Sequence, residues 1–310
     1  MLRIGNHTVE MNVQHHMNRR SFLASLTVAP IVAALAACGD PNQPAAATQP
    51  TSVTTTPGTD PPTTAASGIA HPTGADDLLL TIGYEGGLVA VGYDFANVPS
   101  LLLSGDGRVF QPAPVPAIYP GPLLPSVSVR TITEAGIQAV LSIADHAGLL
   151  APPPEYPDRH NVADAASTVL TINAAGGAFV HSAYALGMGE PESGARKTLL
   201  DAVTRISDIE ASAGTSNLGA AEQFVATTYR LQSRPIDVNQ LANQEPPPPT
   251  IVDWPATAGV SLAVAGTCAR VDAAAVGSLF ADAKQNTYFK EGDVVYQLAV
   301  RGVLPGDPVC

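Results

Sequence analysis

The sequence predicts a globular domain of the α+β class, with one or two antiparallel sheets built from hairpins and about three helices packed on one face. Strand-forming runs come in pairs separated by short turns that hold glycine, and strands joined by such turns are antiparallel. Three other segments repeat apolar residues at the spacing of an amphipathic helix. Each helical segment follows hairpins, which favours α+β over an alternating α/β order.

The sequence of the first half of the domain predicts two hairpins, a proline-rich loop, a strand and a helix. Pro112–Pro125 holds six prolines, which cannot donate ladder hydrogen bonds, so we expect a loop there. Thr131 and Glu134 have the spacing of a capping box and predict the start of the helix, which ends near Gly148. The predicted strands are Leu78–Tyr84, Leu88–Tyr93, Leu101–Ser104, Arg108–Gln111 and Ser126–Arg130, and the helix buries Ile137, Val140, Leu141 and Ala144.

The sequence of the second half predicts a third hairpin, two further helices and a final hairpin. Asp272 has the position and residue type of an N-cap for the last helix. The lone tryptophan, Trp254, is interpreted as closing the rim of a core, with a recognition loop as the alternative. The predicted elements are strands Ser167–Asn173, Ala178–Leu186, Phe224–Gln232, Val260–Ala265, Thr287–Phe289 and Val294–Val303, and helices Ala195–Ala211 and Asp272–Lys284.

A leader precedes the domain. Met17–Cys38 combines a charged start, an apolar run and small residues before a cysteine, which are the parts of a secretory signal. Leu35-Ala36-Ala37-Cys38 resembles the lipobox of bacterial lipoproteins. The resemblance implies that the Cys38 thiol receives a diacylglyceryl group, that the leader is cut before Cys38, and that the new amino terminus is open to acylation, for example with palmitate.

The export route and the membrane attachment follow from the same leader. Arg19 and Arg20, followed by Phe22 and Leu23, resemble the twin-arginine consensus, although Ala24 stands where lysine is common. The alternative is that the two arginines supply the positive charge of a general secretory leader. The apolar run is shorter than the roughly 20 residues of a membrane-spanning helix. We therefore expect attachment by lipid to the extracytoplasmic face of the cell membrane.

Three regions follow: a signal peptide at residues 1–37, a tether at 38–75 and a single α+β domain at 76–310. The true start is open between Met1 and Met17, because a leader normally begins near its arginines. The tether is rich in proline, threonine and alanine and poor in large apolar groups, so it cannot bury enough surface to fold. Its expected role is to lift the domain off the membrane.

The charge balance excludes one class of partner. The chain carries 15 Lys plus Arg and 27 Asp plus Glu, a net charge of −12. Removing the leader takes away three arginines and one glutamate and leaves −14. With no cluster of basic residues, the sequence offers no electrostatic footprint for nucleic acid. No motif indicates a cofactor.

Once Cys38 is assigned to the lipid, Cys268 and Cys310 remain as a pair. Thiols of secreted domains tend to be oxidised, and we expect a disulfide here. A bridge closing about 40 residues contributes on the order of 3 to 4 kcal/mol in the loop-entropy model. The alternative is two free or metal-binding thiols, for which no CxxC spacing is present.

The globular part also resembles, as a pattern, uncharacterised secreted proteins of actinobacteria. The shared segments are a GYEGG-type run at Gly83–Gly87, GDGRV at Gly105–Val109, IYPGP at Ile118–Pro122 and VRGVLP at Val300–Pro305. The resemblance covers most of the domain and implies one ordered domain, but it carries no activity over to this chain.

Few residues suggest chemistry. No GxSxG, HExxH or Walker motif occurs. One loop and the strand pair after it hold candidate ligands for a cation, namely Asp158, His160, Asp164 and His181. Their spacing is not diagnostic, and a solvated acidic loop is the favoured interpretation. Glu85, Glu190 and Glu192 are likewise interpreted as solvated carboxylates of turns.

Two hypotheses for function come from different classes. The tether, the acidic domain and the lack of catalytic motifs favour a lipid-anchored, non-catalytic domain that binds an envelope protein or glycan. The rival is a secreted hydrolase, glycan-directed, using carboxylates from separate loops, because glycoside cleavage needs only two positioned acids. Two loop carboxylates roughly 5 to 9 Å apart in an open cleft would favour the enzyme. The sequence leaves the ligand, any catalysis and the oligomeric state open.

Overall fold

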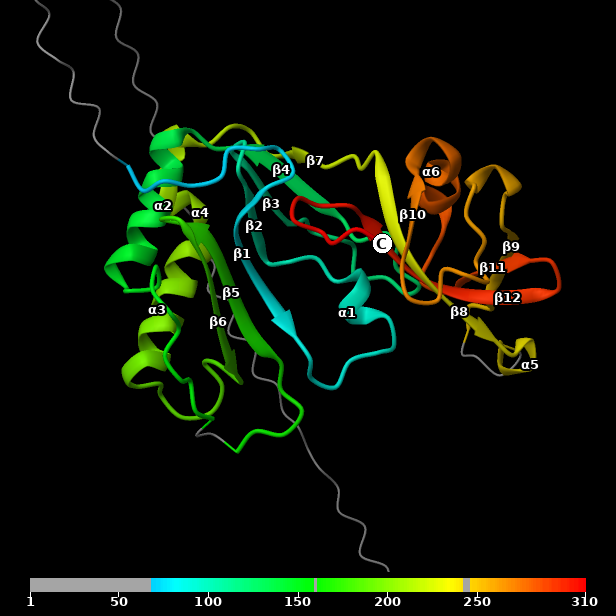
Figure 1. Ribbon diagram of the computed structural model, residues 1–310. Coiled ribbons are helices and arrows are strands. Elements are labelled where there is room, and N and C mark those ends of the chain that lie inside the picture. The colour runs from blue at the N-terminus through cyan, green and yellow to red at the C-terminus, as the bar shows by residue number, and fades with distance from the viewer. Residues whose placement is uncertain (1–67, 159–160, 242–245) are drawn as a thin grey trace, which may run out of the picture. The chain divides into compact units, whose positions relative to one another are not determined.

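The computed structural model describes residues 68–158, 161–241 and 246–310. These residues belong to one compact unit that runs from Thr64 to Cys310. They form two sheets with helices packed on them, which confirms the α+β class (Figure 1). The two largest hydrophobic cores lie in this unit, so we expect it to fold on its own. The predicted lipid site Cys38 and the pair Arg19 and Arg20 lie outside the described residues.

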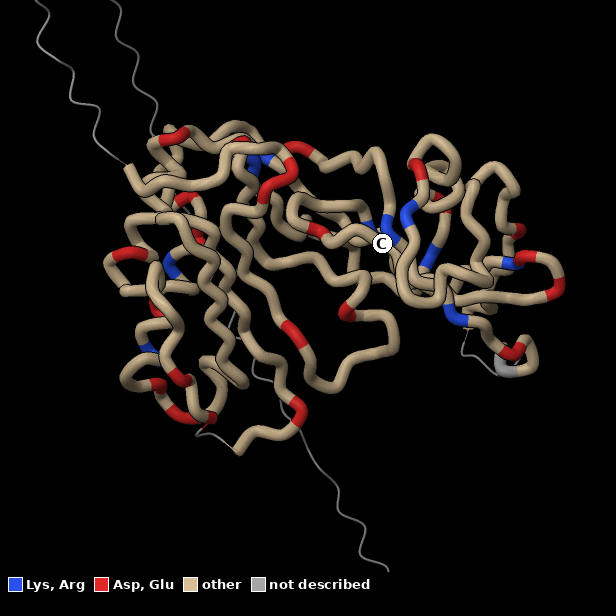
Figure 2. The backbone as a smooth tube through the Cα atoms, in the orientation of Figure 1, with Lys and Arg blue, Asp and Glu red and all other residues tan. Residues whose placement is uncertain are grey.

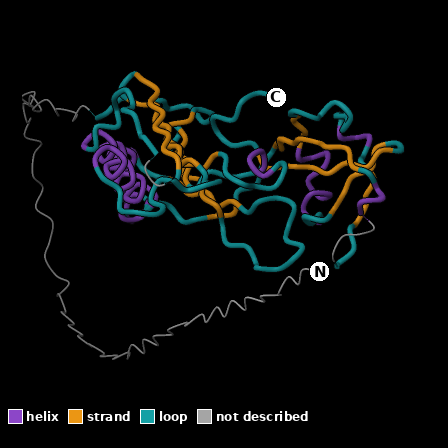
Figure 3. Tube along the Cα trace, turned by 90° about the horizontal axis from the view of Figure 1, so that it is seen from below, coloured by secondary structure: helices purple, strands orange, loops and turns teal. Residues whose placement is uncertain are grey.

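The first sheet has seven strands, each antiparallel to its neighbours. In spatial order they are β6 (Gly177–Tyr184), β5 (Ser167–Ala174), β1 (Leu78–Glu85), β2 (Leu101–Ser104), β3 (Arg108–Pro112), β4 (Val127–Thr131) and β7 (Glu222–Gln223). The helices on it are α2 (Glu134–His146), α3 (Gly194–Ser207) and α4 (Ile209–Ala213). These helices lie along one side of the sheet (Figure 3), and their apolar stripes complete the larger core.

The second sheet has five strands and carries one substantial helix. In spatial order the strands are β10 (Ala269–Asp272), β8 (Thr228–Ile236), β12 (Val294–Gly302), β11 (Thr287–Glu291) and β9 (Thr250–Asp253). Helix α6 (Ala273–Asp282) packs here, and the ring of Phe280 meets those of Tyr229, Trp254 and Phe289. Trp254 is therefore a core residue, as expected. The short helices are α1 (Tyr93–Ala96) and α5 (Val238–Leu241).

Two predicted strands are wrong, and each has a physical reason. Leu88–Tyr93 is a loop that leads into α1, because β1 lies between β2 and β5 and has no free edge for a hairpin partner. Val260–Ala265 is a turn. There the Glu291 carboxylate accepts hydrogen bonds from the backbone N–H of Leu262, at 2.8 Å, and of Ala263, at 3.3 Å, so these donors are not available to a ladder.

Two helix boundaries differ from the predicted ones, and polar side chains set both of them. Thr133, not Thr131, caps α2, and its hydroxyl accepts from the Gly136 N–H. The predicted helix Ala195–Ala211 is broken at Asp208, whose carboxylate accepts from the Ala211 N–H at 3.1 Å and starts α4 instead. Asp272 caps α6 as expected.

Residues before the predicted tether boundary at residue 75 already contact the folded body. Gln138 of α2 holds the backbone of Ile69 through both a donor and an acceptor. The ring of His71, assigned to the tether by sequence, contacts the Glu134 carboxylate at 3.1 Å, and Ala70 accepts from the N–H of Ala175. Residues 68–75 therefore belong to the folded body. Among the described helices, none has the length and apolar character needed to cross a bilayer.

The C-terminal tail is held by a disulfide and by buried charges. Cys268 and Cys310 are bonded, with their Cα atoms 5.1 Å apart, which confirms the predicted pair. The carboxylate of Asp307, only 10% exposed, accepts two hydrogen bonds from Arg301, at 2.6 and 2.7 Å, and one from Arg230 at 3.2 Å. Figure 2 shows basic positions gathered at the C-terminus. Ion pairs therefore hold the tail in addition to the disulfide.

We predict that Asp307→Asn lowers the free energy of unfolding by about 3 to 5 kcal/mol, because it leaves buried guanidinium groups without their counter-charge. Cys310→Ser should lower it by about 3 to 4 kcal/mol while the tail stays docked, and only the double variant should expose the tail to protease. Denaturant titration and limited proteolysis measure both effects. Asp293→Asn, at an exposed carboxylate of the β11–β12 turn, is the matched control and should change little. An Asp307→Asn protein as stable as this control would contradict the argument.

Candidate functional site

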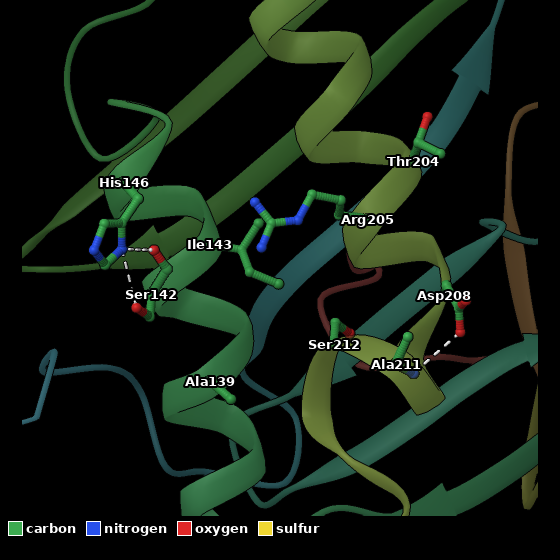
Figure 4. Close-up of a pocket in the computed structure, with 9 residues that line it drawn as sticks. All are labelled: Ala139, Ser142, Ile143, His146, Thr204, Arg205, Asp208, Ala211 and Ser212. Carbon is green, nitrogen blue, oxygen red and sulfur yellow. Dashed lines mark hydrogen bonds between the residues drawn. The ribbon is translucent and has the colours of Figure 1, made fainter.

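A groove runs over the outer surface of the helices that cover the first sheet. Its volume is about 720 Å³, and it opens where α2, α3 and α4 meet (Figure 4). Its lining combines apolar and polar side chains. The lining residues are Ala139, Ser142, Ile143 and His146 of α2, Thr204 and Arg205 of α3, the linking Asp208, and Ala211 and Ser212 of α4.

The break at Asp208 contributes to the groove. A continuous helix from 194 to 213 would run straight, but the Asp208 carboxylate takes the Ala211 N–H and the chain turns at this residue. Ile206 and Ile209, on either side of the break, are still fully buried. The turn therefore leaves the core intact and changes only the outer surface.

His146 and Ser142 lie one turn apart on α2 but do not form a catalytic pair. The His146 Nδ1 lies 2.6 Å from the backbone carbonyl oxygen of Ser142 and 3.1 Å from the Ser142 hydroxyl. A carbonyl oxygen can only accept, so Nδ1 carries the proton and donates it. Nδ1 is then not available to take a proton from the Ser142 hydroxyl, which a serine nucleophile would require.

Arg205 is the cation of the groove. In Figure 4 its side chain extends from α3 towards Ile143 of α2. No described residue forms a hydrogen bond or ion pair with its guanidinium, whereas nearby Lys197 is paired with Asp201 at 2.6 Å. An arginine of this kind can bind a carboxylate or phosphate through two parallel hydrogen bonds. The groove therefore combines apolar lining residues with a cation that no described residue pairs.

The predicted cation ligands do not come together as a site in the described part of the chain. His181 of β6 is fully buried, with its Nδ1 2.7 Å from the Tyr156 hydroxyl and its Nε2 2.9 Å from the Leu149 carbonyl oxygen. Both ring nitrogens are thus engaged. Asp158 and Asp164 are exposed, and His160 lies outside the described residues. Within those residues, no group of three or more His, Cys, Asp or Glu is arranged to hold a metal ion.

The interpretation of Glu192 as a solvated carboxylate is wrong. Its side chain is 3% exposed and pairs with Arg196, which donates from Nε and from one terminal nitrogen, each at 2.7 Å. The same arginine also donates to the carbonyl oxygen of Tyr184 at 3.0 Å. This pair fixes the connection between β6 and α3. Glu85 and Glu190 are exposed, as expected.

A second hollow, of about 460 Å³, brings together Asp253, Trp254 and Glu291. It resembles a glycan-cleaving site in pairing two carboxylates with an aromatic ring, but Glu291 and Trp254 are engaged in structure. One oxygen of Glu291 holds the turn at Leu262, and the indole N–H of Trp254 donates to Val260 at 2.8 Å. Trp254 is also buried in the second core, so its ring offers no open stacking face.

We predict that Tyr156→Phe lowers the free energy of unfolding by about 1 to 3 kcal/mol, because it leaves the buried Nδ1 of His181 without a donor. Burial also raises the pKa of Tyr156, so the unfolded chain ionises this phenol at lower pH than the folded one. That contribution to stability is complete below the unfolded pKa and is lost as pH rises through the folded one. The variant should therefore lose less stability in alkali. Tyr119→Phe, at an exposed tyrosine, is the control, and an equal effect of both changes would refute the assignment.

Comparison with known proteins adds no assignment to this geometry. Neither protein-family models, nor curated proteins, nor solved structures gave a match to this chain.

Proposed function

We propose that this protein is a lipid-anchored envelope protein whose folded domain binds a carboxylate-bearing ligand in the groove between α2, α3 and α4. The observation that carries the binding role is Arg205, a cation that has no partner among the described residues and lines a groove of an acidic protein. A ligand carboxylate would gain two charge-assisted hydrogen bonds there, and the lining side chains of Ala139 and Ile143 would contact its apolar part. Envelope peptides and glycans supply ligands of this chemistry.

The leader and the tether support the location. Leu35-Ala36-Ala37-Cys38 matches the lipobox pattern, and Arg19 and Arg20 fit a twin-arginine leader. Residues 39–67 separate Cys38 from the first described residue, and a tether of this length, flexible as its composition predicts, would span about 30 Å. The domain would then sit close to the outer face of the membrane, where wall peptides and glycans are within reach.

The rival function, a hydrolase that uses loop carboxylates, has less support. Asp208 is the one carboxylate among the residues that line the groove, and it is engaged as a helix cap. In the second hollow Glu291 holds a turn and Trp254 is buried. Glycoside cleavage needs two carboxyl groups that are free to act on the substrate.

We predict that Cys38→Ala moves the protein from the membrane fraction to the soluble fraction or stops its processing, because it removes the acceptor of the lipid. Detergent partitioning and mass spectrometry of the mature amino terminus measure this. Cys310→Ser is the matched cysteine control and should leave partitioning unchanged. Unchanged partitioning of Cys38→Ala would remove the basis for lipid anchoring.

We predict that Arg205→Ala weakens binding of soluble muropeptides, the carboxylate-bearing fragments of the cell wall, by about 10- to 100-fold. This is the loss expected for a charge-assisted hydrogen-bond pair. Arg205→Lys should give an intermediate affinity because it keeps the charge but not the paired geometry. Titration of residues 64–310, followed by NMR shifts or calorimetry, measures the affinities. Arg234→Ala removes another exposed arginine, outside the groove, and should bind like the parent. Equal affinities for all four proteins would exclude the groove.

A further inference from the structure

The sheet edges of this protein are not equally protected against pairing with another strand. An edge strand exposes unpaired N–H and C=O groups, and proteins usually blunt such edges with short strands, charges or proline. Edge strand β7 has only two residues. Edge strand β10 has four residues, among them Arg270 and Asp272, and Arg270 holds the C-terminal tail beside it. Edge strand β9 also has four residues, ends at Asp253 and follows a run of prolines.

Edge strand β6 has none of these protections. It is eight residues long, GAFVHSAY, with no charged residue and no proline. The strand labelled β6 in Figure 1 is accordingly tan in Figure 2, the colour of residues other than Lys, Arg, Asp and Glu. In a chain with 27 acidic and 15 basic residues, two copies repel each other, so an uncharged edge is where that repulsion is least.

The hairpin register shows which backbone groups of β6 face outward. Ala174 pairs with Gly177 across a two-residue turn, and both turn residues, Ala175 and Gly176, have positive φ, at 52° and 76°. In such a turn the closing pair is hydrogen-bonded, and hydrogen-bonded pairs then alternate along the ladder. The bond from the Ala185 N–H to the Ala166 carbonyl oxygen falls on this same alternation.

Three residues therefore present their backbone to the outside, namely Ala178, Val180 and Ser182. Their side chains are small, uncharged and exposed, and Val180 is 48% exposed. No described group forms a hydrogen bond with their N–H or C=O. The next outward carbonyl, that of Tyr184, is already taken by Arg196. The open stretch is thus centred on Val180.

We infer that β6 pairs with β6 of a second copy of this chain, antiparallel, about a twofold axis at Val180. With this register Val180 faces Val180 of the partner subunit, and Ala178 of each copy faces Ser182 of the other. All three outward N–H groups and all three outward C=O groups of each copy are then satisfied. The pairing is self-complementary, as a twofold dimer requires, and it joins two seven-stranded sheets into one. An edge contact is small, so the dimer exchanges with monomer.

Sedimentation of residues 64–310 over a range of concentrations tests this. The parent should associate to a dimer. Val180→Pro should raise the dissociation constant at least about tenfold, because it removes the central outward N–H while the bonds to β5 stay in place. Val180→Thr keeps the backbone donor and should dimerise like the parent, and circular dichroism should show that both variants are folded. A parent that remains monomeric, or a Val180→Pro variant that still dimerises normally, would overturn the inference.

Cysteine cross-linking tests the register independently. Val180→Cys should form a covalent dimer under mild oxidation, because Cα atoms of a directly opposed pair lie about 5.5 Å apart. Ala178→Cys is the matched control on the same face of the same strand. Its symmetry mate is four residues away, roughly 13 Å along the strand, so it should not cross-link with itself. A mixture of Ala178→Cys and Ser182→Cys should give the covalent dimer. Equal cross-linking of Ala178→Cys and Val180→Cys alone would show that this register does not exist.

Discussion

The joint between the two sheets depends on the carboxylate of Asp307. Arg301 of β12 and Arg230 of β8 both donate to it, and the N–H of Leu304 donates at 2.7 Å. Arg230 also lies over the ring of Phe95 in α1, with 4.4 Å from its guanidinium carbon to the ring centre. Burial and the neighbouring Arg301 lower the pKa of Arg230, while Asp307 opposes that shift. One carboxylate therefore offsets a buried excess of positive charge, and the segments that carry these residues are held together by it.

The tail that carries Asp307 also covers apolar surface of the first sheet. Leu304 packs with Val98, Leu102, Phe110 and Val127 in a third cluster. The N–H of Gly306 donates to the backbone carbonyl oxygen of Asp76, just before β1. The tail thus packs apolar side chains against the first sheet and forms ion pairs with arginines of the second sheet. The disulfide to Cys268 adds a covalent restraint to a segment that is already docked.

The sequence predicts well where the signal is local. The stripe of Ile137, Val140, Leu141 and Ala144, the cap Asp272 and the turns after β2 and β5 all depend on neighbours within a few residues, and they are found as expected. The errors arise where a distant residue decides. Whether Leu88–Tyr93 becomes a strand depends on β5, which occupies the edge of β1 and lies about 80 residues further on.

Buried polar pairs are the other source of error, because composition suggests that carboxylates in turns are solvated. Glu291 and Asp307 find donors far along the chain, at Leu262 and Arg230. Glu192 pairs with Arg196, only four residues away, and what the sequence does not show is that this pair is buried. The groove escapes sequence reasoning for a related reason. Arg205 gives no signal by itself, and its importance follows from the break at Asp208. An Asp preceded by Ser207 in the middle of an apolar-periodic segment is the one local sign of that break.

The Arg196–Glu192 pair couples the two surfaces for which we propose partners. Arg196 donates to the carbonyl oxygen of Tyr184 at the end of β6, and it is itself part of the first turn of α3. Glu192 also accepts from the N–H of Gly187. The connection between β6 and α3 is therefore held by an ion pair whose side chains are almost fully buried. Breaking such a pair leaves an uncompensated buried charge, which opposes independent movement of strand and helix. The end of β6 and the helix that carries Arg205 are therefore held together by buried hydrogen bonds.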